Sequence, residues 1–246
     1  MGARQGWSSD GLRLDAGRIA EAYARVRPDL VRDPLLIADA AAYDVGVDAL
    51  DKRMSAPPQD LTADTFWGWL NGADQYRWAG LRVLAEAYAT SGTEYRTGRV
   101  VVPEGTMRIA RGDVRVDGDL VLEDQAMVLV LGTLTVTGSL VALPDYTMVA
   151  AAEAVCRDGV SAGEVLALGA VRCPGTLYLA HGDHSCRAPL CAGGTLVDFE
   201  RDNAFGAVDV AERITDWDFA AAARALGLPE DVDDLRDAYA ARLLGS

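Results

Sequence analysis

The sequence predicts an α+β protein in which a short β-helix, a coil of stacked strands, lies between two helical segments. Two observations lead to this prediction. In the middle of the chain the same residue classes recur about once per coil, and on both sides apolar residues follow helical spacing. We expect about five coils, with a helical N-terminal region at residues 1–98, the β-helix at 99–206 and a C-terminal helical cap at 207–246.

The first part of the chain has the periodicity of helices. Apolar residues recur at steps of three and four over residues 19–26, and Pro28 should end that helix. A second helix is expected over residues 35–43. Thr62 should cap a third helix, and residues 73–90 should form the longest one.

From Val100 onward the period changes to two, and a longer repeat appears. One column is Val114, Leu134, Ala154 and Val171, and the next is Val116, Val136, Cys156 and Cys173, at steps of 20, 20 and 17 residues. Three further columns are Leu120, Leu140, Val160 and Leu177; Leu122, Ala142, Ala162 and Leu179; and Ile109, Leu129, Val149 and Leu166. Inward residues should therefore stack as apolar ladders, whereas an antiparallel sandwich would not require this recurrence.

Helical periodicity returns after Gly206. Asp216 is expected to cap a helix over residues 220–226, and Pro229 to lie near the start of a final helix. The last coil of a solenoid presents unpaired strand edges. The helical segments on both flanks are candidates to cover the two ends.

The formal net charge of −14 limits the classes of partner. It disfavours nucleic acid and anionic membranes, and it favours a basic protein, although acidity also aids solubility. The N-terminal residues lack an apolar signal core, and the longest apolar runs are far shorter than the ~20 residues of a spanning helix. Four cysteines without an export signal are expected to be reduced, so we expect a cytoplasmic protein.

The densest group of reactive side chains lies at residues 181–191. His181, His184, Cys186 and Cys191 are of the types that bind zinc, but their spacing matches no zinc motif. The alternative is a polar loop of a late coil with two wall cysteines. We expect no metal and no cofactor, and these four residues remain the candidate ligands if a metal is bound.

Glycines stand six residues apart at Gly112 and Gly118, and again at Gly132 and Gly138. This spacing resembles the hexapeptide repeat of left-handed β-helix acyltransferases. The resemblance implies a trimeric enzyme in which His181 or His184 deprotonates the acceptor. The pattern is broken at Thr137. No GxSxG, GxGxxG or P-loop motif is present.

The glycine-punctuated strands of residues 112–143 resemble the β-helix of bactofilins, which are polymer-forming cytoskeletal proteins. That resemblance implies self-assembly through the ends of the coil. Residues 175–199 are similar to β-helical proteins encoded beside bacterial polymorphic toxins. This second resemblance implies a stoichiometric inhibitor of a toxin, and an acidic surface would suit a basic toxin.

We therefore expect a non-enzymatic, protein-binding β-helix, which neutralises a toxin in its most specific form. The alternatives are a self-assembling scaffold and an acyltransferase or zinc enzyme. The predicted binding surface comprises Asp117, Asp119, Glu123, Asp124 and Asp183. We expect a basic protein partner, and a protein that is by itself a monomer or a small homo-oligomer.

Overall fold

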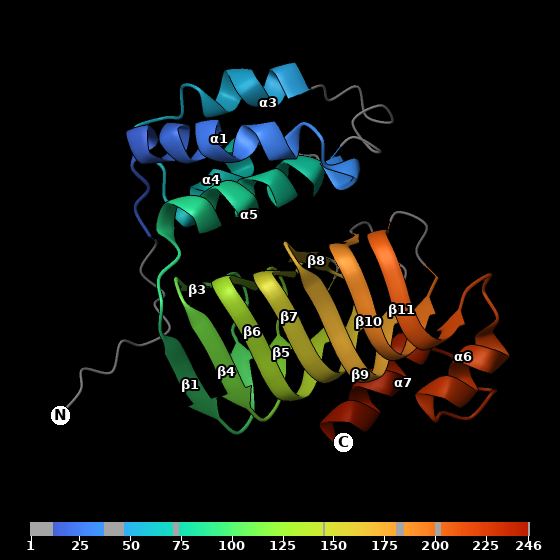
Figure 1. Ribbon diagram of the computed structural model, residues 1–246. Coiled ribbons are helices and arrows are strands. Elements are labelled where there is room, and N and C mark those ends of the chain that lie inside the picture. Colours follow the sequence, from blue (N-terminus) through green and yellow to red (C-terminus); the bar gives the residue numbers. More distant parts are fainter. Residues whose placement is uncertain are drawn as a thin grey trace.

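A computed structural model describes residues 12–36, 47–70, 74–144, 146–180, 185–199 and 203–245. It is a parallel β-solenoid with helices before and after it in the chain, which confirms the predicted fold class (Figure 1). There are about six turns, where about five were expected. All strand pairings within the solenoid are parallel, so the antiparallel sandwich is excluded.

The strands extend beyond the expected limits 99 and 206, because β1 and the final strand both pair with a neighbouring coil. They are β1 (Thr93–Thr97), β2 (Val100–Val102), β3 (Met107–Ala110), β4 (Asp113–Asp117), β5 (Leu120–Leu122), β6 (Met127–Ala142), β7 (Met148–Ser161), β8 (Glu164–Ala167), β9 (Ala170–Leu179), β10 (Cys186–Asp198) and β11 (Ala204–Ile214).

The strand register divides the solenoid into three faces. The first face consists of residues 93–97, 113–117, 133–136, 153–156, 170–173, 190–193 and 207–210. The second consists of residues 100–102, 120–122, 139–142, 158–161, 176–179, 195–198 and 212–214. The third consists of residues 107–110, 127–130, 148–151, 164–167, 186–188 and 204–205. The long strands bend around corners and so contribute to more than one face.

The predicted columns of the first face are correct. Val114, Leu134, Ala154 and Val171 are cross-strand partners in succession, and the column continues through Cys191 and Val208. The residues of both first-face columns, from Val116 to Cys173, are buried in one apolar cluster inside the coil.

The three other predicted columns are each wrong by one residue. Gly159, not Val160, pairs with Leu140 and Leu177, and Ser161 replaces Ala162. On the third face Ala150 replaces Val149 between Leu129 and Leu166. The step from Leu140 to Gly159 is 19 residues and that from Leu129 to Ala150 is 21. Both differ from the expected step of 20, because the corners of successive coils differ in length by one residue.

Glycines allow the coils to approach closely at the corners. A Cβ atom on Gly138 would lie 2.4 Å from Asp119 Oδ1 and 2.6 Å from the carbonyl oxygen of Gly118 in the preceding coil. Gly118 itself has a φ of 151°, a conformation that other residues rarely adopt. Gly118 and Gly138 thus occupy the same corner in successive coils, and the backbone N–H of Gly138 donates to the carbonyl of Gly118.

The N-terminal helices form a layer on one side of the solenoid. They are α1 (Ala16–Leu30), α3 (Val47–Met54), α4 (Ala63–Leu70) and α5 (Asp74–Tyr88). Helix α1 continues past Pro28, because Val31 can still donate to the carbonyl of Arg27. Most of the helix expected at residues 35–43 lies outside the described residues.

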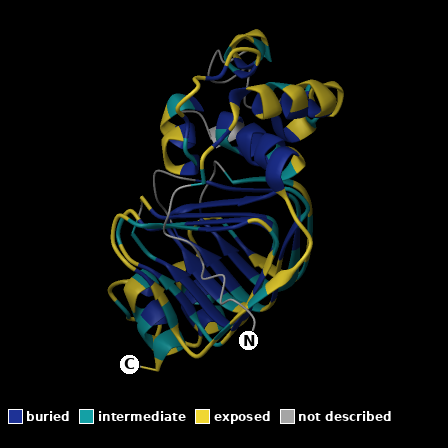
Figure 2. Ribbon diagram, turned by 90° about the vertical axis from the view of Figure 1, so that its left-hand side faces the viewer, coloured by how far each residue is buried: buried dark blue, intermediate teal, exposed yellow. Residues whose placement is uncertain are grey.

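Helix α5 packs on the outside of the third face. The outward side chains Ile109, Leu129 and Leu166 are buried in the same apolar cluster as the helices, so the fifth predicted column faces helices, not the coil interior. The indole nitrogen of Trp78 donates to the carbonyl of Ala167 at 3.3 Å. Figure 2 shows this helical layer beside the buried strands.

The second face is covered by α6 (Phe219–Leu226) and α7 (Leu235–Leu244). Val160 and Tyr178 point outward into an apolar cluster with Ala222 and Tyr239, because the outward positions of this face are apolar. The N-cap of α6 is Asp218, not Asp216 as predicted. Both helical segments thus lie along the sides of the coils, whereas we expected them over the ends.

In the described chain an ion pair, and not a helix, lies at each end of the solenoid. At the first end Glu94 and Arg96 occupy inward positions, in register with Val114 and Val116, and pair at 3.1 Å. At the other end Arg213 pairs with Asp198, whose side chain is buried, at 2.6 Å. Inward-pointing charges on an edge strand hinder pairing with another chain.

Candidate protein-binding surface

The first face is the side of the solenoid on which no described helix packs (Figure 1, front). Its outward side chains stand in columns, as its inward ones do. The central outward column is Tyr95, Arg115, Thr135, Val155, Arg172, Ala192 and Asp209. Tyrosine and arginine are the residue types that most often dominate binding energy at protein interfaces. The Tyr95 side chain is 64% exposed.

The charges on the first face nearly balance. The outward acidic residues are Asp113, Asp117, Glu153 and Asp209, and the outward basic residues are Arg115 and Arg172, with Arg157 at the adjoining corner. The acidic excess is larger after β11. Residues 215–245 hold seven acidic side chains and three basic ones. Six of these seven acidic side chains lie outside the helices, in residues 215–218 and 227–234, so a partner that is attracted by negative charge would meet it mainly in these connecting segments.

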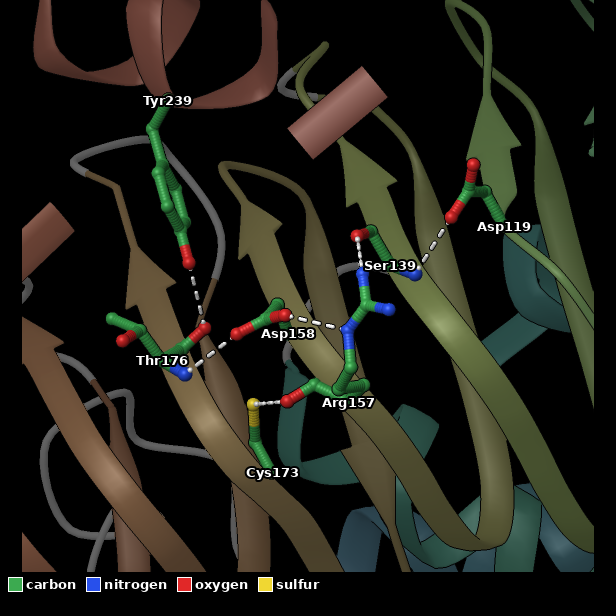
Figure 3. Close-up of polar contacts among 7 residues, drawn as sticks. All are labelled: Asp119, Ser139, Arg157, Asp158, Cys173, Thr176 and Tyr239. Carbon is green, nitrogen blue, oxygen red and sulfur yellow. Dashed lines mark hydrogen bonds and ion pairs between the residues drawn. The ribbon is translucent and has the colours of Figure 1, made fainter. Parts of the chain in front are cut away.

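Between these two regions lies the corner where the first face turns into the second, which we call the aspartate corner (Asp119, Arg157 and Asp158; Figure 3). Asp119 Oδ1 accepts a hydrogen bond from the backbone N–H of Ser139 at 2.9 Å. Asp158 Oδ1 accepts one from the N–H of Thr176 at 3.0 Å. Each carboxylate therefore satisfies a backbone donor of the next coil.

Arg157 links the two levels of this corner. Its Nε donates to Asp158 Oδ2 at 2.9 Å, and this bond raises the pKa of the guanidinium. Its Nη2 lies 3.5 Å from Ser139 Oγ. Above it, the hydroxyl of Tyr239 in α7 donates to the carbonyl of Thr176 at 3.1 Å, as Figure 3 shows. The aspartate corner is thus linked to α7 through Thr176.

The four predicted acidic residues lie at two different corners. Asp117 and Asp119 stand before β5, and Glu123 and Asp124 follow it, at the opposite edge of the second face. Asp117 is exposed and pairs with Arg115 at 2.8 Å. Glu123 accepts a hydrogen bond from the backbone N–H of Glu104 at 3.0 Å. Asp119 and Glu123 therefore support the fold, whereas the exposed Asp117 pairs with Arg115 of its own strand.

The fifth predicted residue, Asp183, lies outside the described residues, as do His181 and His184. Cys186 and Cys191 turn inward and belong to the apolar cluster inside the coil. Burial raises the pKa of the Cys186 thiol and raises that of Cys191 to about 12. Thiols in this state are poor metal ligands. Among the described residues no group of His, Cys, Asp and Glu could hold a metal.

An exposed aromatic cluster at the start of α6 was not predicted. Phe199 stacks on Trp217 with ring centroids 5.3 Å apart, and Phe219 lies 5.3 Å from Phe199. Trp217 is 44% and Phe219 53% exposed. Asp216 and Trp217 have positive φ values of 60° and 59°, which are uncommon for residues other than glycine. The periodicity of the sequence does not predict these positive φ values. The only hint in the sequence is a tryptophan that stands between two aspartates, where a buried aromatic residue is not expected.

Comparisons of the chain with protein-family models, curated proteins and solved structures find no match. In the part of the chain that the structure describes, no helix is long and apolar enough to span a membrane.

Proposed function

We propose that this protein binds a basic protein across the first face and the aspartate corner. The observation that carries the proposal is the uncovered first face, since helices cover the outward apolar positions of the other two. A flat wall of outward strand residues offers area and shape for a macromolecule, and it offers no enclosed pocket for a small one.

The charge of the chain supports a basic partner. The excess of 37 acidic over 23 basic residues creates a negative field that speeds association with a cation, and salt screens this field over ~8–10 Å. The aspartate corner contacts α7 through Thr176, and the acidic segment 230–234 directly precedes that helix. In its most specific form the proposal is a stoichiometric inhibitor of a basic bacterial toxin, as the likeness of residues 175–199 to toxin-linked β-helices suggests.

The test uses two arginines at the centre of the first face. Thr135 and Val155 are cross-strand partners that point outward, so Thr135→Arg with Val155→Arg adds bulk and two positive charges at one place. Ala24→Arg with Ala56→Arg adds the same charge at exposed positions of the helical region. The unchanged protein and both variants are used to isolate partners from one cell extract.

The proposal requires a protein that the unchanged chain and the helical-region control retain and that the first-face variant loses. After purification this protein should form a complex of defined stoichiometry, with an association rate that falls as salt rises. If the partner is a toxin, co-expression should restore growth with the control and not with the first-face variant. Equal recovery by all three proteins, or no such partner, would overturn the proposal.

Self-assembly is the second candidate, and the last coil favours it. The side chains of Phe205, Val208 and Val210 pack only partly buried against the core, and in the described chain β11 pairs on one side only. Head-to-tail stacking would place the Glu94–Arg96 pair against these apolar residues, which is costly. We therefore expect no filaments, and sedimentation of the protein at rising concentration checks this.

A further inference from the structure

A cleft of about 600 Å³ lies between helices α4 and α5 and the corner where the second face turns into the third. Cavities of roughly 300–1,000 Å³ are typical of small-molecule sites. The cleft is separate from the first face, so an inference about it goes beyond the protein-binding proposal.

A ladder of methionines forms the floor of the cleft. Met107, Met127 and Met148 are cross-strand partners in three successive coils, and Glu164 takes the same position in the fourth. Three of the five methionines of the chain thus stand in one row. Thioether side chains are flexible and polarisable, and they adapt to apolar ligands of different shapes.

The helices supply the other wall. Asp64 and Gly68 lie one helical turn apart in α4, so both reach the cleft from the same face of the helix. Trp67 adds its ring from α4, and Tyr146 adds a second ring from the corner loop. No heavy atom would lie within 4 Å of a Cβ placed on Gly68, so the cleft has free space at this point.

The charges that line the cleft sum to minus one. Arg77 Nη1 and Glu164 Oε2 lie 2.8 Å apart, and the Glu164 side chain is 1% exposed, so this pair neutralises itself. Asp64 is the remaining charged residue of the lining. Asp64 is exposed, so its charge is open to a ligand. The ring of Tyr146, which is 61% exposed, also attracts cations.

We propose that this cleft binds a small lipophilic cation, meaning an apolar molecule that carries one ammonium-like charge. The methionine ladder and Trp67 bury the apolar body, and Asp64 faces the positive charge. The cleft volume sets the size of the ligand at that of a drug-like molecule.

Two probes of nearly equal size and shape but opposite charge test the proposal by titration calorimetry. Tetraphenylphosphonium should bind the full-length protein at one site, at least about tenfold more tightly than tetraphenylborate. Asp64→Asn should reduce this preference by about tenfold. Equal binding of the two ions, or no saturable binding of the cation, would overturn the proposal.

Gly68→Phe places a ring in the cleft and should abolish binding of the cation. Gly68→Ala is the matched control, and it should bind as the unchanged protein does. Both substitutions replace a helical glycine, so the melting temperature should not fall and lost binding cannot reflect unfolding. Unchanged affinity in folded Gly68→Phe would place the bound cation elsewhere and refute the site. The first-face variant Thr135→Arg with Val155→Arg should keep full affinity, which separates this test from that of the protein-binding proposal.

Discussion

The carboxylate of Asp119 accepts the backbone N–H of Ser139, which lies 20 residues later and one coil further along the solenoid. Asp113 holds Thr133 at 2.8 Å and Asp158 holds Thr176 at 3.0 Å in the same way. These side chains satisfy backbone donors where the strand ladder is interrupted at a corner. Their first role is therefore to hold the coils together.

Replacement of Asp119 should reduce stability. Asp119→Ala removes a charge-assisted acceptor and should cost about 1–2 kcal/mol of unfolding free energy. Asp117→Ala loses one exposed ion pair and should cost no more than about 0.5 kcal/mol. Urea unfolding of both variants measures the difference, and equal effects would show that the Asp119 bond has no structural role.

Val136 tests the interior column. Val136→Asp places a charge between Val116 and Cys156 and should cost about 3–5 kcal/mol, enough to unfold a marginal protein. Thr135→Asp, on the next residue, points outward and should remain folded. Circular dichroism and thermal unfolding distinguish the two, and a folded, stable Val136→Asp protein would contradict the inward assignment.

The buried thiols predict a loss of stability at alkaline pH. Burial raises the pKa of Cys191 from its ordinary value of 9.0 to about 12. Above pH 9 the Cys191 thiol of the unfolded chain releases its proton, while the thiol of the folded chain keeps it. Between pH 9 and 12 this thiol should therefore remove stability at a rate approaching about 1.4 kcal/mol per pH unit.

Cys191→Val provides the control for this pH dependence. Its cross-strand neighbours in the column are Val171 and Val208, so valine suits the site. The variant should show a smaller fall in unfolding free energy between pH 9 and 11 than the unchanged protein, and the two should behave alike below pH 8. Parallel curves over the whole range would refute the assignment to Cys191.

The charged pair at the first end predicts a change of assembly. Glu94→Val with Arg96→Val extends the columns of Val114 and Val116 to the edge strand and removes the inward charges. This variant should associate as concentration rises, which light scattering detects. Tyr95→Val, which changes the outward residue between them, should scatter as the unchanged protein does.

The interior of the first face was predictable because its inward residues alternate without interruption. Val114 and Val116 are separated by a charged residue, and their partners recur 20 residues later. The second and third faces were misaligned by one residue because both neighbours at those places are small or apolar. From residue type alone, Val160 fits an inward position as well as Gly159 does. The structure places Gly159 inward because the corner before it has one residue fewer than the same corner in the preceding coil.

The candidate sites were less predictable than the fold. Asp119 and Glu123 were predicted to belong to the binding surface, because a hydrogen bond to a neighbouring coil cannot be inferred from the local sequence. The row of Met107, Met127 and Met148 was visible at steps of 20 and 21 residues. These methionines line a cleft only because helices pack over the third face, and the periodicity of the sequence does not predict where those helices lie.

Helix α5 lies against β6, β7 and β8, and α7 lies against β6 and β7, so each helix contacts strands of more than one coil. In a bare solenoid each repeat touches only its neighbours, and unfolding can spread inward from the ends one repeat at a time. Here a coil cannot separate without also releasing a helix that its neighbours still hold. Hydrogen exchange in the middle coils should therefore proceed through one concerted opening, with no graded fraying from the edge strands inward.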